Sequence, residues 1–195
     1  MAGDEQTTIH RLLGELEGGN RAALDALFPL VYQELSELAH RLRKRWQGDL
    51  TLNTTALIHE AYLKLVDRPL HAESRAHFLA LAAKAMRHIL INYARDRRAH
   101  KRGGASEALP LDEATFVPGQ PGLSVAQADE LVALDEALHA LERIDRRQSQ
   151  VVECRFFGGM TVDETAAAVG ISPRTVKRDW TMAQAWLARR MEQVS

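Results

Sequence analysis

Apolar residues recur along almost the whole chain at the three- and four-residue spacing of a helix face, as at Leu24, Leu27 and Val31. No segment shows a convincing alternation of apolar and polar residues, which would indicate a half-buried strand. The pattern therefore predicts an all-α protein. Helices are expected over residues 6–17, 20–47 (interrupted or kinked near Pro29), 54–67, 75–99, 126–143, 146–157, 161–168 and 173–192.

Residues 103–125 break the helical pattern. This segment, GGASEALPLDEATFVPGQPGLSV, is punctuated by Gly and Pro and contains 3 carboxylates but no Lys or Arg. Such a composition is typical of a flexible linker. We therefore expect two helical domains, at 1–102 and 126–195, joined by an acidic linker at 103–125.

The start and stop signals between residues 161 and 173 predict a helix-turn-helix. Thr161 and Glu164 have the spacing of a capping box, which begins a helix. Gly170 tolerates the positive φ that a tight turn between helices requires. Ser172 followed by Pro173 is a second start signal, a capping hydroxyl before a proline in the first helical turn.

The second of these helices has one apolar face and one cationic face. Val176, Trp180, Ala183 and Leu187 share the apolar face and are expected to point inward. The other faces of its N-terminal half carry the side chains that such helices insert into the major groove. The predicted DNA contacts are Ser172, Arg174, Thr175, Lys177 and Arg178. The alternative is a short helical hairpin with a solvated basic face.

Charge is segregated along the chain although the formal net charge is only −1. Residues 40–102 hold 14 Lys and Arg against 5 Asp and Glu, whereas residues 103–142 hold none against 8. A local basic patch, rather than the charge of the whole chain, is the electrostatic mark of a phosphate-binding protein.

Much of this positive charge lies on the helix predicted at 75–99 and in the residues that follow it. Cations at a helix C-terminus can simply complement the helix dipole, but that explanation covers only the last turn. Cations spread over several turns favour binding to nucleic acid. The polar and cationic residues off the apolar stripe are Lys84, Arg87, His88, Asn92, Arg95, Arg97, Arg98, Lys101 and Arg102.

Other classes of function find little support. The single Cys154 excludes an intramolecular disulfide and is expected to be a small core residue. The segment His59-Glu60-Ala61-Tyr62-Leu63 begins like a zinc-protease motif but has Leu63 where the second histidine is required. We expect no catalytic residues, no metal and no cofactor. Neither a signal peptide nor a membrane-spanning run is predicted, so a cytoplasmic location is expected.

Three stretches together resemble RNA polymerase sigma factors of the extracytoplasmic-function (ECF) type, a branch of the sigma-70 class. They are TTALIHEAYLKLVDR, RAHFLALAAKAMRHILINYARDRRAHKRGG and RRQSQVVECRFFGGMTVDETAAAVGISPRTVKRDWTMAQAWL, and the resemblance covers about residues 7–190. It implies a domain for core polymerase and the minus-ten element at 1–102, and a domain for the minus-thirty-five element at 126–195. The linker resembles the segment that threads the basic channels of the polymerase.

The resemblance also assigns roles to individual residues. Helix 54–67 resembles the surface that docks on the polymerase clamp, with Leu57, Glu60, Leu63 and Lys64 as the outward candidates. Helix 75–99 resembles the minus-ten reader, with His77, Lys84, Arg87, His88 and Asn92 on the bases and Arg95, Arg97 and Arg98 on phosphate. Arg174, Thr175, Lys177 and Arg178 resemble the minus-thirty-five contacts. The loop RPLHAESR before helix 75–99 departs from the family pattern because it has no aromatic residue to stack on an unpaired base.

The implied partners are core RNA polymerase and promoter DNA, and the sequence leaves open whether an anti-sigma factor also binds. Two other functions stay open at this stage. One is an autonomous helix-turn-helix regulator that binds duplex DNA as a dimer through residues 126–195. The other is an enzyme with a metal site in its helical N-terminal domain.

Overall fold

A computed structural model describes residues 2–45, 53–67, 70–101 and 124–193 of the chain. These residues form helices and short connections with no strand, so the all-α prediction is confirmed. No helix in the described ranges is long and apolar enough to cross a membrane. The elements are α1 (Ala2–Glu17), α2 (Ala22–Arg45), α3 (Thr54–Val66), α4 (Arg75–Lys101), α5 (Val125–Ile144), α6 (Arg146–Val152), the π-helical segment η2 (Glu153–Phe157), α7 (Val162–Val169) and α8 (Pro173–Glu192).

Several of these helices begin at a side chain that caps the first turn. The Asn53 side chain accepts a hydrogen bond from the Ala56 amide at 2.7 Å, which starts α3. Ser124 and Gln127 form a complete capping box at the start of α5. Such caps satisfy amides that have no partner within the helix and stabilise the helix by about 1 kcal/mol each.

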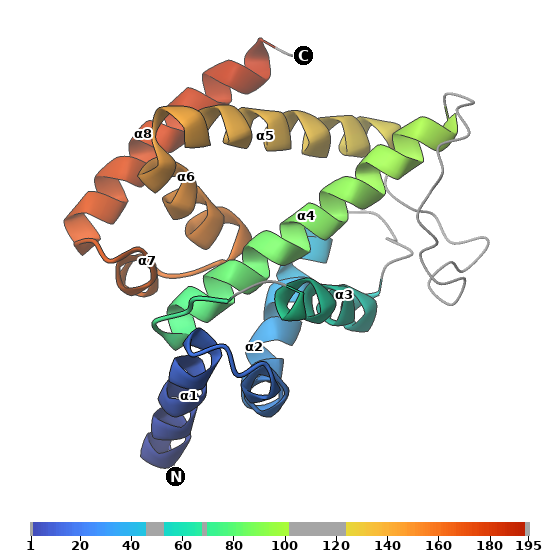
Figure 1. Ribbon diagram of the computed structural model, residues 1–195. Helices are drawn as coiled ribbons and strands as arrows, with labels where there is room; N and C mark the ends of the chain where they lie inside the picture. The colour runs from blue at the N-terminus through green and yellow to red at the C-terminus, as the bar shows by residue number, and fades with distance from the viewer. Residues whose placement is uncertain (1, 46–52, 68–69, 102–123, 194–195) are drawn as a thin grey trace.

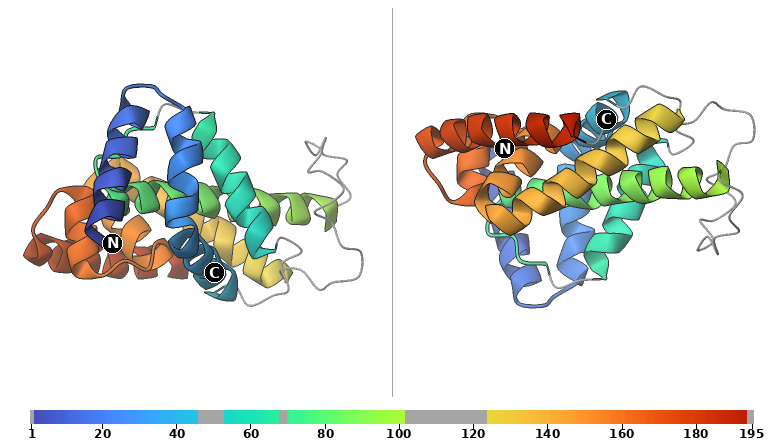
Figure 2. Two further views of the ribbon diagram at one scale, coloured as in Figure 1. Left: turned by 90° about the horizontal axis from the view of Figure 1, so that it is seen from below. Right: turned by 90° about the horizontal axis from the view of Figure 1, so that it is seen from above.

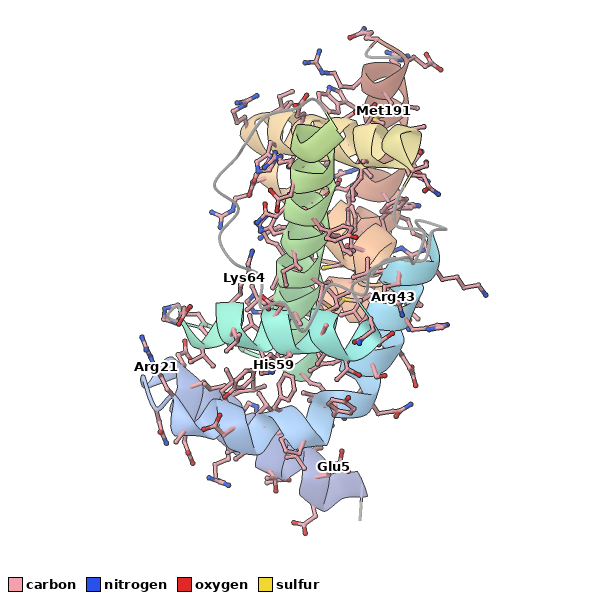
Figure 3. All side chains as sticks on the ribbon, turned by 90° about the vertical axis from the view of Figure 1, so that its right-hand side faces the viewer. Glu5, Arg21, Arg43, His59, Lys64 and Met191 are labelled. Atoms are coloured by element: carbon pink, nitrogen blue, oxygen red, sulfur yellow. The ribbon has the colours of Figure 1, made fainter. Side chains whose placement is uncertain are left out.

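The prediction for α2 was an interruption or kink near Pro29. The helix is continuous through Pro29, so it is not interrupted. It does change direction along its length, as Figure 3 shows between the ends marked by Arg21 and Arg43. An internal proline removes one backbone hydrogen bond and is a common cause of such a bend.

Helix α4 lies between the other two groups of helices. Figure 1 shows α1, α2 and α3 on one side of it and α5 to α8 on the other, and both views in Figure 2 show α5 crossing α4. A single cluster of buried apolar residues runs through both groups, from Ile9 in α1 to Leu187 in α8. Phe78 and Met86 of α4 are completely buried within it. The predicted linker lies outside the described residues, except for Ser124 and Val125.

Helix α3 shows where the inward and outward faces were placed wrongly from the sequence. Leu57 was expected to face outward, but it is 0% exposed and belongs to the core. Leu63, on the same helix, is 43% exposed as expected. Tyr62 is only partly buried and makes an edge-on contact with Phe28. The inward face of α3 is therefore centred on Leu57, Ala61 and Leu65.

The different burial of these two leucines gives a direct prediction about stability. Leu57→Ala should lower the free energy of unfolding by about 2–5 kcal/mol, because it removes buried methyl groups and leaves a cavity. Leu63→Ala should change it by about 0.5 kcal/mol or less, because the side chain is largely in solvent. Urea unfolding followed by circular dichroism measures both values. Equal losses for the two variants would show that the faces of α3 are assigned incorrectly.

Candidate nucleic-acid interface

The turn between α7 and α8 has the local geometry that its sequence predicts. Gly170 adopts a left-handed conformation with φ 70°, and its amide donates to the Ala166 carbonyl at the end of α7. The Ser172 side chain then accepts from the Thr175 amide at 3.2 Å and caps α8. Thr161 and Glu164 make the predicted capping box on α7. These contacts orient the first turn of α8 toward solvent.

The inward side of α8 consists of the predicted apolar stripe and one buried carboxylate. Val176 and Ala183 are completely buried, and Trp180 is partly buried with the Arg155 guanidinium 5.6 Å from its ring centre. Asp179, which was not among the residues predicted from the sequence, is 1% exposed and accepts a hydrogen bond from Arg147 Nε at 2.6 Å. This ion pair joins α8 to α6. The available signal for this ion pair was in the sequence, where Asp179, three residues after Val176, interrupts the run of cations.

Arg174 and Lys177 lie on the outward side of the first turns of α8. Both are exposed, and neither side chain has a partner in the described part of the chain. Arg178 is also exposed, but its guanidinium donates two hydrogen bonds of 3.1 Å to Asp179. Thr175 is half-buried and its hydroxyl lies 2.9 Å from that of Ser172. Of the five predicted contacts, Arg174 and Lys177 are therefore the ones most available to a ligand.

Helix α4 presents a different picture, because its central cation is buried. Arg87 is 3% exposed and lies between the two carboxylates of Asp135 on α5 and Glu153 on η2. The distance from Arg87 Nη2 to Glu153 Oε1 is 2.7 Å, and the guanidinium lies 5.4 Å from the centre of the Phe157 ring. Burial raises the pKa of Glu153, and the positive charge of Arg87 opposes that shift. In this structure Arg87 cannot reach a nucleic acid.

Two further cations of α4 are also paired with carboxylates of α5. Arg95 donates to Asp135 Oδ2 at 3.0 Å, and Lys84 lies 3.5 Å from Glu142. Both of these cations remain partly exposed, with side-chain exposures of 51% and 42%.

The remaining α4 candidates differ in how they are placed. Asn92 is exposed, and His77 is half-buried in the first turn, where its amide donates to the Ser74 hydroxyl. Arg97 and Arg98 belong to α4, but their side chains lie outside the described residues.

His88 lies at the contact between α4 and α5, where its ring stacks on that of His139 with 6.4 Å between centres. Burial, followed by the charge of Arg87, lowers the pKa of His88 to about 4, so the ring is neutral at pH 7. His88, His139 and Asp135 bring one possible ligand atom each within 4.8 Å of one another. A metal ion fits poorly there, because Arg87 and Arg95 already hold the Asp135 carboxylate.

The polymerase candidates on α3 form a smaller surface than expected. Leu63 is exposed, and Glu60 and Lys64 are half-buried, whereas Leu57 belongs to the core. Figure 3 shows Lys64 and His59 on this helix where it crosses α4.

The described residues offer little support for an enzyme. Cys154 is buried in η2, and burial raises its pKa to about 12, so it carries no thiolate at neutral pH. Its place in the core was predicted and is confirmed. His59 is exposed on α3, with Leu63 in place of a second ligand one turn later.

Comparison with known protein families identifies the family to which the chain belongs. The model of the family described as ECF sigma factor matches residues 6–193, which extend from within α1 to the end of α8. No curated protein and no solved structure matches the chain. Because the match extends over nearly the full length, the chain belongs to the ECF sigma factor family.

Proposed function

We propose that this ECF sigma factor binds core RNA polymerase and directs it to promoters through two DNA-reading helices. The family acts in transcription initiation and is not enzymatic. The observation that carries the proposal is the exposed, unpaired pair Arg174 and Lys177 in the first turns of α8. Because the proposed partners are core RNA polymerase and promoter DNA, the proposed location of the protein is the bacterial cytoplasm.

Helix α8 is the proposed reader of the minus-thirty-five element. Arg174 and Lys177 are three residues apart and therefore share one face of the helix. Arginine can make two hydrogen bonds to the edge of a guanine in the major groove. Ser172, Thr175 and Arg178 complete the proposed contact surface, with Arg178 positioned by Asp179.

Helix α4 is the proposed reader of the minus-ten element. Its exposed Asn92 and the half-buried His77, Lys84 and His88 would contact bases, whereas Arg95 would contact phosphate. Arg87 joins this set only if α5 moves away from it. Arg97 and Arg98 would extend the phosphate contacts toward the end of the helix. Each neutralised phosphate adds to affinity and to its dependence on salt.

Leu63 is the centre of the proposed polymerase surface on α3, with Glu60 and Lys64 beside it. An exposed leucine between partly exposed charged residues is typical of a small docking surface with an apolar centre and a polar rim.

The function as a whole is tested by reconstituted transcription. Core bacterial RNA polymerase together with this protein should give run-off transcripts from a cognate promoter, whereas neither component alone should do so. The promoter can be found by mapping transcription starts after overexpression of the protein. Tight occupancy of the promoter by the protein without recruitment of core polymerase would support an autonomous regulator instead.

A substitution in α8 separates base reading from general charge. Arg174→Ala should relax the preference at one minus-thirty-five position, since a two-bond arginine contact discriminates between bases by about 1–3 kcal/mol. The matched control is Arg189→Ala, which removes an exposed arginine at the far end of the same helix. Transcription from a library of minus-thirty-five variants measures both. A uniform loss on all library members for Arg174→Ala would mean that Arg174 contacts only phosphate.

A substitution in α3 tests the docking surface. Leu63→Glu should reduce capture of core polymerase at least tenfold, because a charge at the centre of an apolar contact loses its hydration without gaining a partner. Tyr32→Glu is the control, since Tyr32 is a similarly exposed apolar residue on α2, at 42% against 43% for Leu63. Pull-down with immobilised polymerase gives the ratio. If both variants bind as the unmodified protein does, the polymerase surface lies elsewhere.

A further inference from the structure

Three cations that the proposed function assigns to minus-ten DNA are engaged by carboxylates from the C-terminal half of the same chain. Arg87 is paired with Asp135 and Glu153, Arg95 with Asp135, and Lys84 with Glu142. The carboxylates of α5 and η2 thus occupy positions on α4 where DNA phosphates would be needed.

The charges on the two helices are complementary over a longer range than these pairs. Helix α4 holds 7 Lys and Arg against 1 Asp, and helix α5 holds 5 Asp and Glu against 1 Arg. Within α5, Asp135 is 2% exposed although it is a carboxylate, and both of its oxygens are used by arginines of α4. An acidic helix is therefore held on the cationic face of α4.

We propose that the packing of α5 on α4 is an autoinhibited state, in which Asp135, Glu142 and Glu153 occupy the minus-ten surface in place of DNA. The proposal rests on the proposed function, because it assumes that α4 reads the minus-ten element. DNA binding through α4 then requires α5 and η2 to separate from it. Separation frees Arg87 from both carboxylates and from the Phe157 ring, and leaves it only the contact of 3.2 Å with His88 on α4 itself among the described contacts.

The contact is suited to such separation. Within the described residues, Arg87 Nε and Glu153 Oε2 are buried without a hydrogen-bond partner, so the pair is incompletely satisfied. Buried ion pairs often contribute little net stability, because the loss of hydration offsets the attraction between the charges. The exposed pair of Lys84 and Glu142 contributes little as well.

The autoinhibited state should also lower the apparent affinity of the protein for DNA. If only a small fraction of molecules is open, the apparent affinity for DNA is reduced by that fraction. A change that favours the open form should therefore strengthen DNA binding, even though it adds no contact to DNA.

The test compares two neighbouring carboxylates on α5 in the full-length protein. Asp135→Asn removes the negative charge shared by Arg87 and Arg95 and replaces one of the two acceptor oxygens with a donor amide, whereas Glu136→Gln makes the same change of charge at an exposed side chain. Binding is measured by fluorescence anisotropy with a labelled single-stranded DNA of mixed sequence, and compactness by small-angle X-ray scattering. Asp135→Asn should bind this DNA roughly tenfold more tightly and have a larger radius of gyration. Glu136→Gln should match the unmodified protein.

Equal DNA affinities for the two variants, or an unchanged radius of gyration for Asp135→Asn, would overturn the proposal. Circular dichroism checks that the helices persist, because Asp135→Asn leaves the buried Arg87 with only one of its two carboxylate partners. If this variant loses helical signal, Glu142→Gln replaces it, since Glu142 is 40% exposed and its loss endangers the fold less. It should bind the DNA roughly twofold more tightly than Glu136→Gln, and equal binding would again overturn the proposal.

Run-off transcription with core polymerase separates this proposal from the proposed function. If the unmodified protein supports transcription but Asp135→Asn and Glu136→Gln bind DNA equally, the autoinhibition is wrong and the sigma function stands. If no transcription occurs with any of the proteins, the proposed function fails and this inference fails with it.

Discussion

The burial of the Arg87 guanidinium is the constraint on which the arrangement of the helices depends. A charge that is 3% exposed must be compensated, and Asp135 and Glu153 supply the compensation from two different elements. The positions of α5 and η2 both follow from their contact with this guanidinium. Asp135 brings α5 across α4, and the π-helical segment η2 places Glu153 and Phe157 against the same guanidinium. π-helical segments of this kind occur frequently at functional sites.

Helix α4 consequently serves two kinds of contact at once. Its apolar side, with Phe78 and Met86, joins a core that includes the N-terminal helices. Its polar side meets carboxylates of α5 through Lys84 and Arg95. Apolar packing depends little on what is dissolved around it, whereas ion pairs compete with any other polyanion that approaches. Helix α5 also contributes apolar residues to this core, so within its contact with α4 the ion pairs are the part open to exchange with nucleic acid.

Helix α8 also has a buried carboxylate paired with arginines, but there the pairing leaves two other cations of the helix exposed. The buried Asp179 pairs with Arg147 of α6 and with Arg178, and so holds α8 firmly on its own domain. Because that carboxylate points inward, Arg174 and Lys177 remain exposed on the outer side. Of the two proposed reading helices, α8 thus leaves Arg174 and Lys177 unpaired, whereas Lys84, Arg87 and Arg95 of α4 are paired with carboxylates from α5 and η2.

The sequence alone determined the helices, their caps and the family, because periodicity, capping residues and turn glycines act over a few neighbouring positions. Thr161, Gly170 and Ser172 each do what their local sequence indicates. The sequence could not determine that Leu57 is buried, since a helix with apolar residues on more than one side does not reveal which side is covered. Nor could it pair Arg87 with Asp135, which lies 48 positions further along the chain, beyond the predicted linker. Only the tertiary structure decided which cations face solvent, because a charged side chain is free or buried according to distant groups that packing brings beside it.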